Sequence, residues 1–220
     1  MDYYYNIGNT TFFYKNIFKD ETFLEDVIKE CQYSILDEKF FARFGVESTF
    51  NKQRININKS YSQYTELEKY IFKNSKNLKN SFITIRKDVE ILISETTRKI
   101  LDEKITNIVN VLYPEKAGDI KIEYSSIIGD NDGYMMNKHT DSGNNRLCTA
   151  VFYLNSKENN SGGDVIFYEG YDKNAKEMFR YSPQKNDLII FDSFRNESTL
   201  EHSVDEIKNW DRYVYRIYFK

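Results

Sequence analysis

The chain changes character near residue 117, and this change limits the folds open to it. After residue 117, short alternating or apolar segments recur, bounded by residues that favour turns. Before it, apolar residues recur at spacings of three and four over 21–35 and 86–112, the period of an amphipathic helix. We therefore expect an α+β protein with a mainly helical flank over 1–116 and a β core over 117–220.

The β core is predicted to contain about eight strands. Strands at this spacing suit a double-stranded β-helix, the cupin-like jelly roll, with helices packed on its outside. The predicted strands cover 120–127, 135–141, 147–154, 164–168, 178–181, 187–191, 201–204 and 212–219, with turns at 129–133, 142–145, 159–163 and 185–187. No linker or internal repeat divides the sequence, so residues 1–220 are predicted to form a single domain.

Charge and cysteine content narrow the cellular setting. The formal net charge of −3 provides no field that would draw the molecule onto nucleic acid or an anionic membrane. Cys31 and Cys148 lie far apart and outside any metal-binding spacing, which fits a reducing compartment. The sequence shows neither a signal peptide nor a long apolar run, so we expect a cytoplasmic protein. Nothing in the sequence sets its oligomeric state.

Histidine occurs only twice, at His139 and His202. In a strand, His139 and Asp141 would project from the same face because side chains two residues apart share a side. Two imidazoles and one carboxylate with open positions left over form the ligand set of non-haem iron(II) oxygenases. A lone His-x-Asp pair is weak, and a single histidine is usually just packed or exposed. The combination, with Arg212 ten residues after His202, favours a metal site over structural histidines.

From Tyr124 to Phe219 the chain resembles the iron(II)- and 2-oxoglutarate-dependent dioxygenases, specifically their prolyl-4-hydroxylase-like branch. Over 1–116 the similarity is one of general shape only. The resemblance rests on an ordered series of motifs: His139-Thr140-Asp141, Thr149-Ala150-Val151-Phe152-Tyr153-Leu154-Asn155, Gly162-Gly163-Asp164, Pro183-Gln184-Lys185-Asn186-Asp187-Leu188-Ile189-Ile190-Phe191, His202-Ser203-Val204 and Arg212-Tyr213.

The resemblance implies that His139, Asp141 and His202 bind Fe(II). It also implies that 2-oxoglutarate chelates the iron through its 1-carboxylate and keto oxygen, with O2 as co-reactant and ascorbate as a candidate reductant. Arg212 is the implied partner of the other carboxylate of 2-oxoglutarate, the far carboxylate, which does not chelate the iron. This assignment balances charge, because iron(II) with one aspartate is left at about +1 while the cosubstrate brings about −2, and a guanidinium pairs with a carboxylate bidentately.

The same resemblance implies further cosubstrate contacts. Tyr153 corresponds to a tyrosine that supports the far carboxylate, and Tyr124 to one near the iron-bound end. Because the chain has 18 tyrosines, either residue could instead simply pack in the core. Thr149 shares the face of Tyr153 by strand parity and is expected to line the same site.

Two other arginines are candidates for contacts at the site. Arg216 has the parity of Arg212, but four residues of strand separate them by about 13 Å, so one carboxylate cannot engage both. An inward Arg216 would need its own acidic partner. Arg146 stands where related enzymes place a substrate-contacting arginine, although a solvated turn residue is the alternative.

The implied reaction couples oxidative decarboxylation of 2-oxoglutarate to hydroxylation of an unactivated C–H, with release of succinate and CO2. The expected substrate is a prolyl or other amino-acid residue in a peptide or protein; a free amino acid or small metabolite is the alternative. Segments 169–176 and 196–200 are expected to shape the entrance. Outside this class, a non-oxygenase metal cupin would have no use for Arg212, and a non-catalytic binding module would not need intact ligands.

Overall fold

The structure is a computed structural model of the whole chain. It describes residues 2–7, 10–48, 54–74, 78–79, 83–130, 133–141, 146–157, 161–169, 175–193 and 201–220. The turn predicted at 142–145, the segment 196–200 and most of the 169–176 loop lie outside the described residues, as do parts of the turns predicted at 129–133 and 159–163.

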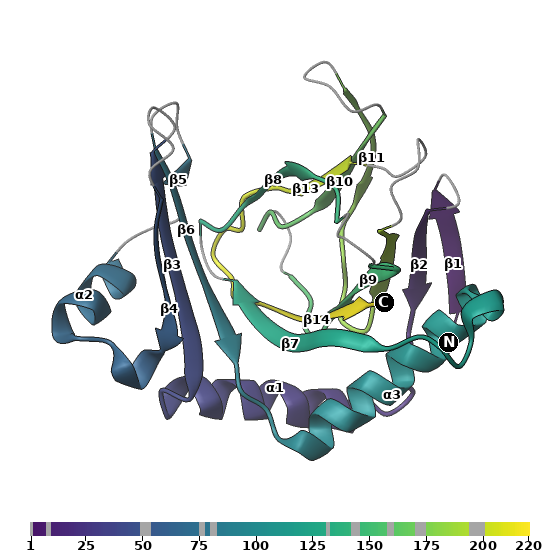
Figure 1. Ribbon diagram of the computed structural model, residues 1–220, viewed down its shortest axis with the longest axis horizontal. Helices are drawn as coiled ribbons and strands as arrows, with labels where there is room; N and C mark the ends of the chain where they lie inside the picture. Colours follow the sequence, from purple (N-terminus) through teal and green to yellow (C-terminus); the bar gives the residue numbers. More distant parts are fainter. Residues whose placement is uncertain are drawn as a thin grey trace.

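The described part of the chain is mostly β-sheet, arranged in two sheets that face each other (Figure 1). Its strands are β1 (Asp2–Ile7), β2 (Thr11–Lys15), β3 (Phe40–Ser48), β4 (Arg54–Ser60), β5 (Leu78–Lys79), β6 (Ile83–Ile91), β7 (Ile122–Asp130), β8 (Met136–His139), β9 (Cys148–Tyr153), β10 (Val165–Glu169), β11 (Lys176–Tyr181), β12 (Leu188–Asp192), β13 (Glu201–Val204) and β14 (Arg212–Phe219). The ten-stranded sheet has the order β1-β2-β12-β9-β14-β7-β6-β3-β4, with β5 beside β6. The four-stranded sheet has the order β11-β10-β13-β8. We call these the large and the small sheet.

Three α-helices accompany the sheets: α1 (Glu21–Leu36), α2 (Glu66–Asn74) and α3 (Glu95–Leu112). Short 3₁₀ turns, η1 (Tyr61–Gln63) and η2 (Pro114–Lys116), follow β4 and α3. The helix predicted over 21–35 is confirmed as α1. The Asp20 side chain caps α1 by accepting a hydrogen bond of 3.2 Å from the Phe23 backbone N–H.

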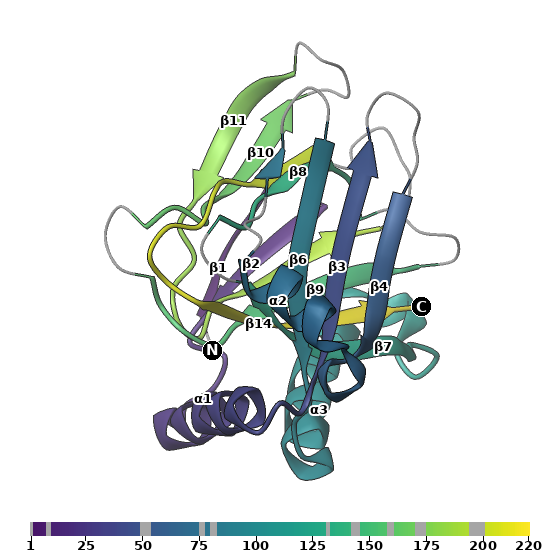
Figure 2. The ribbon, with the colours of Figure 1, turned by 90° about the vertical axis from the view of Figure 1, so that its left-hand side faces the viewer.

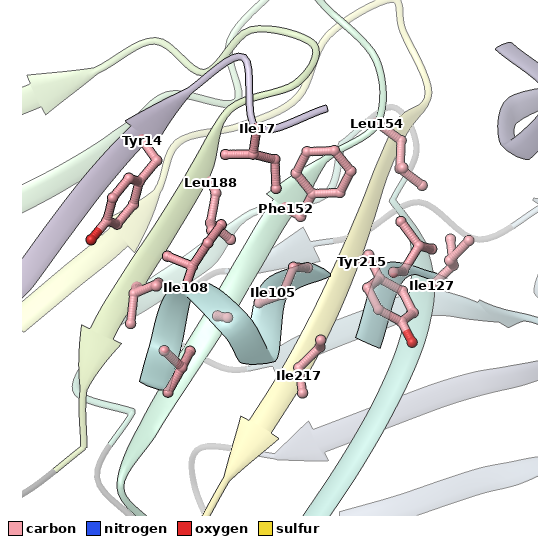
Figure 3. Close-up of a cluster of buried hydrophobic side chains, with 14 of the residues drawn as sticks. Tyr14, Ile17, Ile105, Ile108, Ile127, Phe152, Leu154, Leu188, Tyr215 and Ile217 are labelled. Carbon is pink, nitrogen blue, oxygen red and sulfur yellow. The ribbon is translucent and has the colours of Figure 1, made fainter. Parts of the chain in front are cut away.

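The outer face of the large sheet is covered by α1 and α3, which cross beneath it in Figure 1. Buried side chains of α3, including Ile105 and Ile108, pack against strand residues such as Phe152, Leu188 and Ile217 (Figure 3). Burial of this apolar surface fixes the helices on one side of the sheet. The opposite face is left to form the interior between the two sheets.

A second apolar cluster fills this interior. The members alternate along their strands with the helix-facing residues, as expected for a sheet buried on both faces. The large sheet contributes Phe13, Ile128, Tyr153, Ile189, Phe191 and Val214, and the small sheet contributes Val165, Phe167, Tyr181 and Val204. The predicted strands over 147–154, 187–191 and 212–219 coincide with β9, β12 and β14, which form the middle of the large sheet.

The expectation of a mainly helical flank over 1–116 is wrong, because β1 to β6 all lie there. The helix predicted over 86–112 begins only at Glu95, after a strand that ends at Ile91. The apolar residues at 83, 85, 89 and 91 fit a period of two. Ser94 then caps α3 by accepting a hydrogen bond of 3.2 Å from the Thr97 N–H.

The N-terminal strands extend the large sheet at both ends. Strand β2 pairs with β12, and β6 pairs with β7. Strands β6, β3 and β4 then stand side by side in Figure 2. Within the described residues, no helix is both long enough and apolar enough to span a membrane. Cys31 and Cys148 are both buried as free thiols.

Candidate metal centre

His139, Asp141 and His202 come together at one end of the small sheet. His139 and His202 are directly opposite each other in the antiparallel pair of β8 and β13. Asp141 lies just beyond β8, with its two carboxylate oxygens 3.5 Å from His139 Nε2 and 3.8 Å from His202 Nε2. One ligand atom from each residue lies within 4.8 Å of the others, close enough for a single cation to bind all three. The structure thus brings together the three predicted ligands.

The His139 ring is oriented for metal binding through Nε2. Its Nδ1 lies 2.7 Å from the backbone oxygen of Asn137, which can only accept a hydrogen bond, so Nδ1 carries the proton. The Nε2 lone pair is then left facing the Asp141 carboxylate. A backbone carbonyl that fixes the tautomer in this way is the usual outer partner of a metal-binding histidine.

His202 is held by aromatic rings. The Phe191 ring lies nearly parallel to it, with 4.1 Å between ring centroids and 12° between planes. Phe167 lies farther off, at 6.2 Å. Only 5% of the His202 side chain is exposed, against 31% for His139. Of the two histidines, His202 is therefore buried in the protein and His139 is partly exposed to solvent.

A polar network on the other face of the small sheet ties the two histidine-bearing strands together. Lys138 Nζ lies 3.3 Å from Glu201 Oε2 and 5.0 Å from the centroid of the Tyr168 ring. The Tyr168 hydroxyl also hydrogen-bonds Ser203 Oγ at 2.8 Å. These contacts fix β8 against β13, and with them the separation of the two imidazoles.

The Asp141 carboxyl is kept ionised by its neighbours. Burial alone would raise its pKa, but the protonated forms of His139 and His202, through a hydrogen bond from His139 and their charges, and the charge of Arg216 outweigh burial and lower the pKa. An ionised carboxylate beside two imidazole nitrogens fits a divalent cation such as Fe(II).

Arg212, the predicted clamp for the cosubstrate, is bound to Asp130 in the structure. Arg212 Nε lies 3.0 Å from Asp130 Oδ2, and Nη2 contacts the same oxygen. Both residues are buried, with side chains 4% and 1% exposed. Tyr153 lies close enough for both charges to act on its phenol, although burial is the main cause that raises the pKa of Tyr153. Arg212 Cζ also lies 5.4 Å from the Tyr134 ring centroid.

The other predicted lining residues gather elsewhere along the interior. Tyr124 stacks on Tyr218 with 6.2 Å between ring centroids. Thr149 is the cross-strand neighbour of Tyr218 in one direction and of Phe191 in the other. Its hydroxyl lies 3.4 Å from Ser193 Oγ. The predicted cosubstrate residues therefore form two groups, Tyr153 with Arg212 and Tyr124 with Thr149.

Arg146 and Arg216 both lie against the Tyr218 ring. Arg146 Cζ is 3.7 Å and Arg216 Cζ 5.1 Å from its centroid. Arg146 also pairs with Glu123, at 3.4 Å between Nε and Oε2. Among the described residues no carboxylate forms an ion pair with Arg216, although its charge acts on Asp141, whereas Arg212 pairs with Asp130.

A glycine turn anchors the connection between His202 and Arg212. A Cβ on Gly162, which has φ of +67°, would lie 1.8 Å from the backbone oxygen of Glu206. The Ser161 carbonyl accepts hydrogen bonds from Lys208 N–H at 2.7 Å and Trp210 Nε1 at 3.1 Å. This close backbone approach explains why the Gly162-Gly163 motif needs glycine.

Sequence reasoning missed two residues of the site: Asp130, and Phe191 as a partner of His202. Strand parity places Asp130 on the same face of β7 as Ile128, which was a usable signal. A buried arginine also requires a carboxylate partner. Neither signal identifies Asp130 as the partner of Arg212 unless the pairing register of β7 against β14 is also known.

The comparisons with known proteins agree with this geometry. No curated protein matches the sequence. Among solved structures, the fold is similar to the viral collagen prolyl hydroxylase of Paramecium bursaria Chlorella virus-1 in its 2OG complex (TM-score 0.54, 12% identity, covering 96% of this chain and 94% of that one). It is also similar to a Pseudomonas putida prolyl-4-hydroxylase (0.56, 13%, 96% and 92%).

A third similar structure is the non-haem α-ketoglutarate-dependent epimerase SnoN of nogalamycin biosynthesis (TM-score 0.56, 10% identity, covering 96% of this chain and 77% of that one). At such identities the similarity is one of fold. The sequence itself carries the assignment, because residues 123–220, which hold all three predicted ligands, match the profile of the 2OG-Fe(II) oxygenase superfamily. This segment of the chain is therefore similar to the 2OG-Fe(II) oxygenase superfamily.

Proposed function

We propose that this protein is an Fe(II)- and 2-oxoglutarate-dependent dioxygenase that hydroxylates an unactivated C–H bond. The observation that carries the proposal is the convergence of His139, Asp141 and His202 within 4.8 Å. Two neutral imidazoles and one carboxylate suit iron(II) and leave positions for a chelating cosubstrate and O2. When bound, iron(II) and 2-oxoglutarate supply the oxidising chemistry: 2-oxoglutarate, O2 and substrate C–H give succinate, CO2 and substrate C–OH.

The chain's own residues hold and orient the reactants. The Asn137 carbonyl fixes the His139 tautomer, and Phe191 holds the His202 ring. Tyr124 and Thr149 are proposed to line the cosubstrate site. The resemblance assigns the far carboxylate to Arg212 and Tyr153. The Asp130 carboxylate already accepts a hydrogen bond from the Arg212 guanidinium. A cosubstrate bound at Arg212 would have to share the guanidinium with Asp130 or displace Asp130 from it.

For the substrate we propose a prolyl or other amino-acid residue in a peptide or protein. The prolyl-4-hydroxylase-like motifs between Tyr124 and Phe219 support this choice. A free amino acid or small metabolite is the alternative, because the same fold is found in an epimerase of nogalamycin biosynthesis.

The cofactor assignment is tested without a substrate. Under anaerobic conditions, Fe(II) and 2-oxoglutarate should give the weak visible charge-transfer band of their chelate on the protein. His139→Ala should abolish the band while the protein keeps its fold, because one of three ligands is lost. A folded wild-type protein that gives no band would contradict the oxygenase proposal and favour a non-oxygenase metal cupin or a binding module.

The substrate class is tested by succinate release. Wild-type protein with Fe(II), 2-oxoglutarate, O2 and ascorbate is incubated with proline-containing peptides or with free amino acids. We expect peptides to raise succinate release above the uncoupled background and to gain one oxygen atom by mass. If only free amino acids do so, the peptide assignment is wrong and the alternative holds.

A further inference from the structure

Helix α2 turns an apolar face to solvent. Leu67, Tyr70 and Ile71 lie at helical spacing on one side of the helix, and they are 68%, 66% and 37% exposed. We call these three side chains the α2 face. In Figure 1, α2 stands at the left-hand end of the molecule, outside the β6-β3-β4 end of the large sheet and away from the interior.

The other side of α2 is held firmly by the rest of the chain. Thr65 and Glu68 form a capping box, in which the backbone N–H of each residue donates to the side chain of the other, at 2.8 and 3.2 Å. Glu68 also pairs with Lys59 of β4 at 2.8 Å, and Phe72 packs in a buried cluster with Tyr61. A helix that is apolar on two sides and buried on only one is suited to a partner on the other.

Two charged side chains of opposite sign flank the α2 face at its ends. Glu66 begins the helix with its side chain 94% exposed, and Lys73 stands in the last turn. Because they are seven residues apart, they lie on the same side of the helix. The charge between them is turned inward, since Lys69 lies 3.3 Å from Glu38 in the turn before β3.

A second copy of α2, packed antiparallel, complements this arrangement. A two-fold axis through the middle of the α2 face would bring Glu66 of each copy to the level of Lys73 of the other. The helix dipoles would then also oppose each other favourably. Parallel packing would place like charges at the same level, and a uniformly acidic or basic partner would match only one end of the face.

The available area fits a weak dimer. Burying the α2 face would remove roughly 350 Å² of side-chain surface per copy, less than half of a standard interface. Tyr33 and Leu36, in the last turns of α1, are also exposed, and the turn that follows them contacts α2 through Glu38. With them the surface reaches roughly 600–700 Å² per copy, the lower end of the range for specific interfaces.

We propose that the protein forms a two-fold symmetric dimer through the α2 face, with the two α2 helices antiparallel and Glu66 of each copy paired with Lys73 of the other. An interface of this size corresponds to a dissociation constant of about 1–100 μM. The α2 face is separate from the metal centre, so the inference does not depend on the proposed function.

Sedimentation equilibrium of the full chain, at concentrations from about 2 to 200 μM, measures the association. Wild-type protein should pass from monomer to dimer mass over this range. Tyr70→Ser should raise the dimer Kd at least about tenfold, because a central aromatic side chain is lost from both copies. Val111→Ser is the matched control: Val111 is 74% exposed on α3, and its replacement should leave the Kd unchanged.

Charge reversal tests the antiparallel arrangement. Glu66→Lys and Lys73→Glu should each raise the Kd by about 3- to 10-fold, because each places like charges together at two symmetric positions. The double variant restores opposite charges and should return the Kd to within about threefold of wild type. Both of its new charges oppose the helix dipole, so recovered association cannot come from a more stable α2.

Wild-type protein that stays monomeric up to about 200 μM overturns the inference and leaves the α2 face to a different partner. A dimer whose Kd is insensitive to Tyr70→Ser uses another surface, which also overturns it. So does a double variant that associates no better than the single charge reversals. Circular dichroism of each variant checks the fold; if Tyr70→Ser does not fold, the charge reversals decide.

Discussion

Phe191 and His202 belong to different sheets, yet their rings lie face to face with 4.1 Å between centroids. Phe191 comes from β12 of the large sheet and His202 from β13 of the small sheet. The contact crosses the interior and connects the position of a metal ligand directly to the packing of the two sheets. A change in that packing is therefore expected to reach the metal centre.

Phe191→Leu should weaken metal binding about tenfold, because an aliphatic side chain cannot hold the imidazole flat and partners of ligating histidines commonly contribute that much. Chelator competition with Co(II) measures the effect. Phe152→Leu is the matched control: Phe152 is a buried phenylalanine of β9 on the helix-covered face. Equal losses of metal affinity in the two variants would mean that general destabilisation is responsible.

Asp130→Ala should lower the free energy of unfolding by about 3–5 kcal/mol, because Arg212 would remain buried without its counter-ion. Replacing both partners, as in Asp130→Leu with Arg212→Met, should cost much less, since neither charge is then left unpaired. Urea denaturation measures both changes. If the double variant is as unstable as Asp130→Ala, the loss of stability does not come from an unpaired buried charge, and this explanation is wrong.

The Asp102 carboxyl is expected to make stability depend on pH. Burial raises the pKa of Asp102, and hydrogen bonds from Tyr215 and Ser125 only partly oppose this. A raised folded-state pKa favours the protonated form, so this contribution to stability is complete below the unfolded value of about 4. It is lost as pH rises through the folded pKa.

Asp102→Asn stays neutral at every pH, so the variant should gain stability relative to wild type between acidic and neutral pH. Urea denaturation of both proteins across this range provides the comparison. A difference that stays constant, or that changes in favour of wild type, would contradict the raised pKa.

Gly162→Ala should destabilise the protein more than Gly118→Ala. Both glycines have positive φ, +67° and +96°, so each variant should lose about 1 kcal/mol from backbone strain. Only at Gly162 does the new Cβ meet the Glu206 backbone oxygen, which should cost about 1–3 kcal/mol more. Thermal unfolding of both variants gives the difference, and equal losses would mean that the Gly162 turn relaxes without cost.

Local sequence patterns predicted the middle of the large sheet well. The segments 147–154 and 187–191 are short apolar runs, and β9 and β12 occur there because both faces of these strands are buried. The convergence of His139 with Asp141 also followed from local geometry. Its extension to His202 rested on the scarcity of histidine and on the spacing to Arg212, and the resemblance to a family supported it, because no local pattern specifies which distant strand pairs with β8.

The N-terminal half was less predictable, for a physical reason. Residues 86–93 contain enough apolar positions to fit both a helical and a strand period, and only pairing of β6 with β3 and β7 selects the strand. The partner of Arg212 was also not predictable from the sequence. Asp130 is its neighbour only through the register of β7 against β14, a non-local property that one sequence does not reveal.

The central position of β14 has a consequence for how the molecule assembles. Without this strand, the large sheet separates into β1-β2-β12-β9 and β7-β6-β3-β4, which share no other pairing among the described residues. Its insertion joins two half-sheets across long sequence separations, a step that is slow for such topologies. Because β14 carries Arg212 and β7 carries its partner Asp130, this buried ion pair can form only when the two half-sheets are joined.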